Sequence, residues 1–225
     1  SSDLNEVANL CEKVGANVQE VARGIGLDGR IGGKFLHAGP GYGGSCFPKD
    51  TLALVQTARD HGAPLHIIEA VVKVNEDRKR QMAEKIISAC GGSVGGKTIA
   101  VLGLTFKPNT DDMRDSPSLA IVPALQAGGA TIRAFDPQGM KEAEEMLPGV
   151  VFCGDAYETM EGADALAIVT EWNEFRLLDL ERVKGLLSAP LIIDLRNIYK
   201  ADEIVKAGFD YFSVGRDPVL AANGQ

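Results

Sequence analysis

The sequence lacks the features that mark membrane proteins and secreted, disulfide-rich proteins. No apolar run approaches the roughly 20 residues that a membrane-spanning helix needs. The opening SSDLNEVANL does not join a basic segment to an apolar one, so we expect no signal peptide. The four cysteines are too widely and irregularly spaced for a disulfide framework or a metal cluster: Cys11, Cys46, Cys90 and Cys153. Together these absences predict a cytoplasmic protein without a metal site.

Positive charge is also scarce. The chain has 23 Lys and Arg against 31 Asp and Glu, which gives a net charge of −8 and a pI near 5.0. We therefore expect no general binding to nucleic acid or to an anionic membrane. A phosphate ligand is still compatible with this balance, because a pocket needs only two or three well-placed cations. The 225 residues, 45% of them hydrophobic, can form one large core or two modest ones.

A dinucleotide-binding fingerprint is missing as well. Glycines at 24, 26 and 29, and again at 39, 41 and 44, fit the spacing G-x-G-x-x-G. The fingerprint requires a preceding strand, which neither match has, so we interpret both as glycine-rich turns. The one strand that could carry a phosphate-binding loop, in TIAVLGLTFKPNTDD, is followed only by Gly103.

Residues 1–92 have the periodicity of helices. Apolar residues at helical spacing predict a first helix over residues 4–14, which stops at Gly15. Asn17 and Glu20 form a capping-box pattern that predicts a second, short helix.

A long helix is predicted from Leu65 to about Ala89, after a shorter one over residues 51–59. Its first half has a broad apolar face, and a stripe this wide indicates burial on two sides, here against a second subunit. The residues of this face are Leu65, Ile67, Ile68, Val71, Val72 and Val74.

The composition changes at CGGSVGG, residues 90–96, where we place a domain boundary between residues 1–92 and 93–225. Beyond it, short apolar runs alternate with helix-like stretches, which predicts a doubly wound, Rossmann-like α/β domain with a parallel sheet. A ligand is then expected at the carboxyl ends of the strands, beside the loops that begin at Leu104 and Arg196. The strand-like runs are KTIAVLGL, TIRAFD, ADALAIVT, PLIIDLR and YFSVG.

The stretch GPGYGGSCFPKD, residues 39–50, presents one thiol after an unusually bare backbone. We expect Pro48 to be the first helical residue, which sets Cys46 at a helix N-terminus where the macrodipole and Lys49 favour the thiolate. Asp50 lies one turn along, where it can cap amides or orient a water. The glycines allow a flat ligand to lie against the backbone. These features predict a functional nucleophile.

Two alternatives remain at this point. The stretch can be a glycine-rich turn with an incidental cysteine, which is how we interpret the other three cysteines, as small core residues. A cysteine hydrolase or redox sensor is also possible, with a histidine beside Cys46. The candidates are His37, His61 and His66.

Three segments resemble the UDP-glucose dehydrogenase family: GLDGRIGGKFLHAGPGYGGSCFPKD, GLTFKPNTDDMRDSP and IIDLRNIY. The similarity covers nearly the whole chain and corresponds to the family's central helical domain and C-terminal sugar-nucleotide domain. Family members that act on GDP-mannose or UDP-N-acetylmannosamine differ around these segments. Arg30, Lys34 and the KFLHAG run favour UDP-glucose.

The resemblance implies oxidation of a sugar C6 alcohol to a carboxylate in two steps, with NAD as the cofactor. Cys46 matches the nucleophile that captures the aldehyde as a thiohemiacetal, which is oxidised to a thioester and hydrolysed. Asp50 matches the residue that positions or deprotonates water.

The resemblance also implies binding roles. Arg30 matches an arginine that reaches a neighbouring subunit's substrate, which implies a homodimer. The residues expected at the sugar nucleotide are Arg30, Lys34, Phe35, Leu36, His37, Ala38, Gly39, Tyr42, Gly43 and Lys107. The expected cofactor contacts are Lys49 and Arg114, with Arg196 as a further cation near the ligand.

The family's N-terminal NAD-binding domain has no counterpart here, so we expect this chain to be a fragment that is inactive alone. Two other functions stay open: a nucleotide-sugar-binding and dimerisation module without catalysis, and a dehydrogenase for another nucleotide sugar such as GDP-mannose.

Overall fold

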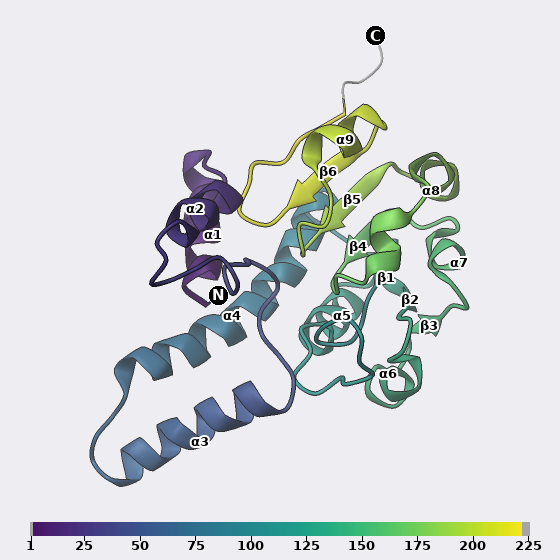
Figure 1. Ribbon diagram of the computed structural model, residues 1–225. Coiled ribbons are helices and arrows are strands. Elements are labelled where there is room, and N and C mark those ends of the chain that lie inside the picture. The colour runs from purple at the N-terminus through teal and green to yellow at the C-terminus, as the bar shows by residue number, and fades with distance from the viewer. Residues whose placement is uncertain (1, 222–225) are drawn as a thin grey trace.

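Four helices form the first part of the chain in the computed structural model, which describes residues 2–221 (Figure 1). The first helix ends where Gly15 takes a φ of +71°, a conformation that glycine adopts without steric cost. Asn17 begins the second, because its side chain accepts a hydrogen bond from the N–H of Gln19. The helices are α1 (Ser2–Val14), α2 (Val18–Gly26), α3 (Cys46–Asp60) and α4 (His66–Ala89).

Helix α3 and the first half of α4 form an antiparallel hairpin that projects away from the rest of the molecule (Figure 1). The predicted long helix is confirmed, with 24 residues. The apolar side chains in its first half are exposed or half-buried in the single chain. The four helices between Ser2 and Ala89 agree with the predicted helical character of this part, whereas dimerisation through it stays a prediction.

The second part is built on a six-stranded, fully parallel sheet of order β3-β2-β1-β4-β5-β6. This is the predicted doubly wound arrangement, with the strand order reversing between β1 and β4. The two-residue strand β3 was not predicted, because it is too short to show a pattern. The strands are β1 (Thr98–Leu102), β2 (Thr131–Phe135), β3 (Val151–Phe152), β4 (Ala165–Ile168), β5 (Leu191–Asp194) and β6 (Asp210–Ser213).

Helices lie on both faces of the sheet, so alternate strand residues enter different cores. Ile99 and Val101 belong to a core shared with α1, α4 and α5, while Ala100 and Leu102 belong to the core on the other face. The remaining helices are α5 (Ser118–Ala127), α6 (Met140–Met146), α7 (Ala156–Met160), α8 (Leu180–Leu186), α9 (Ala201–Lys206) and the 3-10 helix η1 (Asn173–Leu177).

The two parts of the chain share one of these cores. Leu4 from α1, and Met82 and Ile86 from α4, pack with the sheet residues of the first core. The second half of α4 is thus fixed to the sheet, while its first half stands free of it. Within residues 2–221, no helix has both the length and the apolar character that crossing a membrane requires.

Candidate active site around Cys46

Cys46 is the first residue of α3, and its side chain is exposed. The prediction that Pro48 opens the helix is wrong, because the helix begins two residues earlier, at Cys46 itself. The prediction that the thiol lies at a helix N-terminus is confirmed. Its Sγ lies 3.6 Å from the hydroxyl of Ser45. The sulfur is therefore open to solvent at the positive end of a helix dipole.

The glycine-rich loop packs directly on the loop that follows β1. The N–H of Gly44 donates to the carbonyl of Arg114 at 2.7 Å. A Cβ added at Gly43 would lie 2.4 Å from the carbonyl oxygen of Asp115, and one at Gly44 would lie 2.8 Å from the ring of Phe106. We expected the bare backbone to admit a ligand. At Gly43 and Gly44 the loop that follows β1 packs against the bare backbone instead.

A pocket of about 370 Å³ opens beside this loop. It lies at the carboxyl ends of the strands, since Phe106 follows β1 and Arg196 follows β5. Six predicted residues line it, together with three that the sequence reasoning missed. The predicted residues are Phe35, His37, Gly39, Tyr42, Gly43 and Arg196, and the missed ones are Asn5, Gly41 and Phe106.

Arg196 is the cation built into the pocket wall, with 15% of its side chain exposed. Its Nε donates to the carbonyl of Val169 at 2.8 Å and its Nη2 to the carbonyl of Phe106 at 3.1 Å. The carboxylate of Glu171 lies 3.0 Å from Nε. Burial lowers the pKa of Arg196, an effect that the charges of Glu171 and Asp194 oppose. Arg196 thus offers a fixed positive charge to a ligand in the pocket.

The guanidinium of Arg114 interacts electrostatically with the thiol of Cys46. Its guanidinium is held by Asp112, with Nε and Nη2 each 2.9 Å from a carboxylate oxygen, and 66% of the side chain is exposed. The hydrogen bonds to Asp112 chiefly raise the pKa of Arg114, and the charge of Cys46 adds to this effect. Asp112 therefore orients an exposed cation near the thiol.

The other predicted cations lie on the surface. Lys49 and Asp50 are both exposed and form an ion pair at 3.5 Å. Lys107 stands over the ring of Phe106, with Nζ 5.2 Å from its centroid. Arg30 is held by Asp28 through an Nη2–Oδ2 contact of 2.5 Å and points to solvent.

Three residues of the predicted substrate segment differ in their surroundings. Leu36 and Ala38 are half-buried against the core that α1 and α4 share with the sheet, so their side chains help to fix the segment. Lys34 is exposed.

The histidines do not gather around the thiol. His61 caps the C-terminal end of α3, and His66 is the exposed first residue of α4. His37 lines the pocket, which Cys46 does not. The alternative of a cysteine–histidine hydrolase therefore gains no support from the described residues.

Asp136 follows β2, where a dinucleotide-binding Rossmann domain carries the acidic residue that bonds the ribose. Here the carboxylate is fully buried, and groups of the same chain donate hydrogen bonds to it. It accepts hydrogen bonds from the N–H groups of Leu104 at 2.7 Å and Gly139 at 2.8 Å, and from Nε1 of Trp172 at 3.1 Å. The end of β2 is thus closed to a nucleoside, and this sheet does not fit the dinucleotide NAD.

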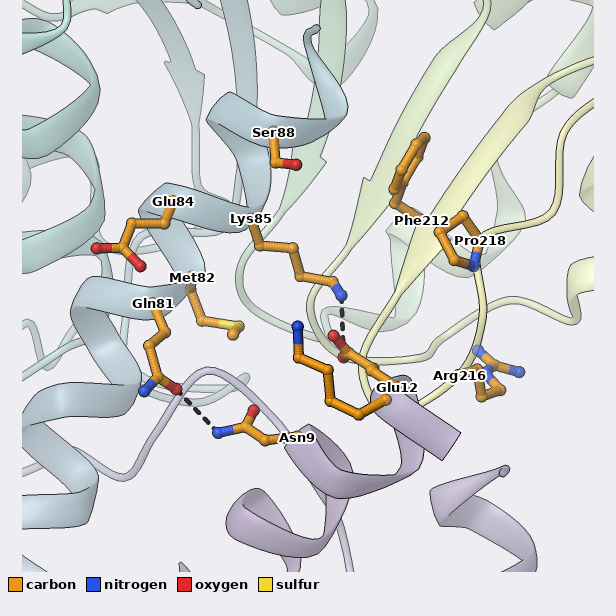
Figure 2. A pocket seen from close by; sticks show the side chains of 11 residues that line it. Asn9, Glu12, Gln81, Met82, Glu84, Lys85, Ser88, Phe212, Arg216 and Pro218 are labelled. Carbon is orange, nitrogen blue, oxygen red and sulfur yellow. Dashed lines mark hydrogen bonds and ion pairs between the residues drawn. The ribbon is translucent and has the colours of Figure 1, made fainter. Parts of the chain in front are cut away.

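A larger hollow, of about 510 Å³, lies between α1, α4 and the segment after β6 (Figure 2). Its central ion pair joins Lys85 to Glu12 at 2.9 Å, and Glu12 also accepts the N–H of Gly215 at 2.7 Å. None of the predicted site residues lines it. We interpret this hollow as a gap in the packing between α1, α4 and the last strand of the sheet.

Comparison with known proteins finds the same family in both parts of the chain. Residues 2–77 match the central domain of the UDP-glucose/GDP-mannose dehydrogenase family, and residues 100–201 match the UDP binding domain of the same family. Together the two matches cover most of the chain. The chain belongs to the UDP-glucose/GDP-mannose dehydrogenase family.

Individual relatives agree with this assignment. The chain is 63% identical, over 213 residues, to the UDP-glucose 6-dehydrogenase of Rhizobium meliloti, covering 95% of this chain and 49% of that protein. It resembles the UDP-glucose dehydrogenase structure from Pyrobaculum islandicum with a TM-score of 0.80 and 34% identity, over 90% of this chain and 45% of that one. The chain thus spans about half the length of the relatives that it matches.

Fold similarity alone does not select the sugar. The structure of an NDP-N-acetyl-D-galactosaminuronic acid dehydrogenase from Methanosarcina mazei gives a TM-score of 0.85 at 28% identity, over 96% of this chain and 47% of that one. This score is higher than that of the Pyrobaculum islandicum UDP-glucose dehydrogenase. The choice of substrate must therefore be argued from sequence identity and from the pocket.

Proposed function

We propose that this chain supplies the nucleophile and the sugar-nucleotide pocket of an NAD-dependent UDP-glucose 6-dehydrogenase that acts in the cytoplasm. The 63% identity to a UDP-glucose 6-dehydrogenase supports this sugar over GDP-mannose. The observation that carries the proposal is the exposed Cys46 at the start of α3, beside a pocket whose wall contains the partly buried Arg196.

Charged and aromatic side chains at the pocket have separate roles in this proposal. Arg196 binds the diphosphate as a donor fixed in the pocket wall, because phosphate groups favour a guanidinium held in one geometry. Phe35 and Tyr42 offer ring faces to the sugar nucleotide, and Lys107 lies on the exposed side of Phe106.

Cys46 acts on the aldehyde formed from the C6 alcohol. Its sulfur adds to the carbonyl carbon, and the carbonyl oxygen takes up a proton to give a thiohemiacetal. After oxidation to the thioester, water adds to the same carbon, the C–S bond breaks, and the carboxylate leaves Cys46 as it was. Asp50, one turn along α3, accepts a proton from this water. Lys49 and Arg114 would contact an NAD⁺ held by a separate domain, and that cofactor would supply the hydride acceptor for both oxidations.

The exposed apolar face of α4 packs on a second copy of the chain, which forms a homodimer and brings Arg30 to the partner's substrate. Because this sheet does not fit NAD, the chain alone does not turn over.

The test is NADH formation from UDP-glucose, measured with the chain alone and with a protein that adds the NAD-binding domain. We expect product only from the longer protein, and a clear preference for UDP-glucose over GDP-mannose. Turnover by the chain alone would overturn the inactivity, and a preference for GDP-mannose would overturn the choice of sugar. Calorimetric titration with both nucleotide sugars gives the same comparison for binding.

A further inference from the structure

Two side chains of α4 hold the loop that precedes Cys46. The amide of Asn75 bonds both backbone groups of Tyr42: Oδ1 accepts the Tyr42 N–H at 2.7 Å, and Nδ2 donates to the Tyr42 carbonyl at 3.2 Å. One turn later, Nε of Arg78 donates to the carbonyl of Gly39 at 2.9 Å. Asn75 and Arg78 are each only 1% exposed. Burial of such polar groups is costly unless they are bonded. The loop bonds the amide of Asn75 and Nε of Arg78, Asn9 of α1 accepts from Nη1 of Arg78, and Nη2 of Arg78 has no partner among the described residues.

The loop is shaped to receive these side chains. Gly41 has a φ of +122°, and a Cβ added there would lie 3.0 Å from Oδ1 of Asn75. Gly39 is bonded on both sides, since its N–H also donates to Oδ1 of Asn5 at 2.9 Å. Desolvation lowers the pKa of Arg78 to about 10, which leaves its guanidinium charged at neutral pH. Its bond to the Gly39 carbonyl is therefore charge-assisted.

The anchored residues lead directly to the nucleophile. The ring of Tyr42 lies edge-on to that of Phe47, with centroids 4.6 Å apart and an interplanar angle of 80°. Phe47 follows the thiol in the chain, and Gly44, two residues before it, is bonded to the carbonyl of Arg114. Cys46 thus lies between two fixed points, and one of them depends on Asn75 through Tyr42.

We propose that Asn75 and Arg78 are positioning residues, which fix the backbone of residues 39–42 and thereby the Cys46 thiol and the edge of the pocket. Neither side chain lines the pocket itself. The proposal rests on the proposed function for what the loop does, whereas the anchoring can be measured without any ligand.

The first experiment compares Asn75→Ala with Asn197→Ala. Asn197 is a matched control, because its amide makes the same pair of bonds to the backbone of Val214, at 2.9 Å each. Amide hydrogen exchange in the free chain should become faster at Tyr42 by roughly tenfold in Asn75→Ala and stay unchanged there in Asn197→Ala. Gly41→Ala, which crowds Asn75 from the loop side, should give the same result and serves if Asn75→Ala does not fold. Unchanged exchange at Tyr42 would overturn the proposal.

The second experiment measures how the loss of these anchoring bonds changes kcat and KM. In the protein that includes the NAD-binding domain, Asn75→Ala should lower kcat about tenfold and leave KM within about threefold. Arg78→Met should chiefly raise KM, because Gly39 borders the pocket. Equal losses of kcat in Asn75→Ala and Asn197→Ala would show a general structural effect and overturn the positioning role. If the unmodified protein makes no NADH from UDP-glucose, the proposed function fails, while the exchange result still decides the anchoring.

Discussion

The backbone N–H of Gly44 donates to the carbonyl of Arg114 at 2.7 Å and so joins the loop that carries Cys46 to the loop that follows β1. These two loops belong to different parts of the chain, and each contains one of the segments that resemble the dehydrogenase family. Their contact puts an arginine held by Asp112 near the thiol. The candidate active site is thus a junction between the helical part and the sheet.

Cys46 should be the cysteine that reacts first with iodoacetamide. It is exposed, whereas Cys11 and Cys153 are buried and Cys90 is partly buried. Burial also raises the pKa of Cys90 and so disfavours its thiolate. Mass spectrometry should find the label on Cys46 in the unmodified chain and in the control Cys90→Ser, and lose the fast reaction in Cys46→Ser. UDP-glucose should slow the labelling, and indifference to it would favour a redox sensor.

Gly43→Ala should destabilise the chain by about 1–3 kcal/mol, because the added Cβ would lie 2.4 Å from the backbone oxygen of Asp115. Gly185→Ala is the control. Its Cβ meets nothing within 4 Å, and Gly185 lies inside α8, where alanine should stabilise by about 0.5–1 kcal/mol. Urea unfolding measures both. A neutral Gly43→Ala would show that the two loops separate easily.

Arg196→Met should cost about 3 kcal/mol of stability, since it leaves Glu171 without its opposite charge and two carbonyls without their donor. The double variant Arg196→Met/Glu171→Met should recover part of this loss. Thermal unfolding of the two variants checks the prediction. Full stability of the single variant would mean that Arg196 serves the ligand alone.

Asp112 should titrate below its ordinary value, because hydrogen bonds from Arg114 lower its pKa. A carboxyl whose pKa is lowered in the folded state stabilises the fold above its unfolded pKa of about 3.9, and this contribution is lost as the pH falls through the folded pKa. NMR titration of the side-chain carboxyl measures the pKa directly. In Arg114→Ala it should rise toward the ordinary value, and no change would show that another group holds Asp112.

Ile67→Lys should weaken the proposed dimer. Ile67 lies on the apolar half of α4 and is 80% exposed in the single chain, so a charge there would be buried at the interface. Leu177→Lys is the matched control, because Leu177 is 83% exposed and lies in η1, on the sheet domain. Analytical ultracentrifugation should show a dimer for the control and monomer for Ile67→Lys. A monomeric unmodified chain would overturn the dimer.

The sequence was sufficient to predict the elements whose causes are local. Short apolar runs, separated by helix-like stretches, predicted five of the six strands. Helical spacing of apolar residues predicted α1 and the 24-residue α4. Strand β3 has only two residues, and its pairing with β2 is a tertiary effect that leaves no pattern. The sequence does not predict the start of α3 at Cys46, because a proline favours the first helical position and Pro48 lies two residues later.

The pocket was predicted less completely, because it is made by contacts between distant segments. Six lining residues came from the resemblance, but Asn5 and Phe106 depend on how α1 and the β1 loop meet the glycine loop. Asn75 and Arg78 did leave a signal that was overlooked. They share one helical face with Met82 and Ile86, so two polar residues interrupt a buried stripe. Polar residues in such positions indicate partners elsewhere in the chain.

Helix α4 connects three parts of the molecule along its length. Its C-terminal half packs against the sheet through Met82 and Ile86. Its middle is hydrogen-bonded to residues 39–42, and its N-terminal end is apolar and exposed. A displacement of the apolar end would therefore move Asn75 and Arg78, and with them the loop that leads to Cys46.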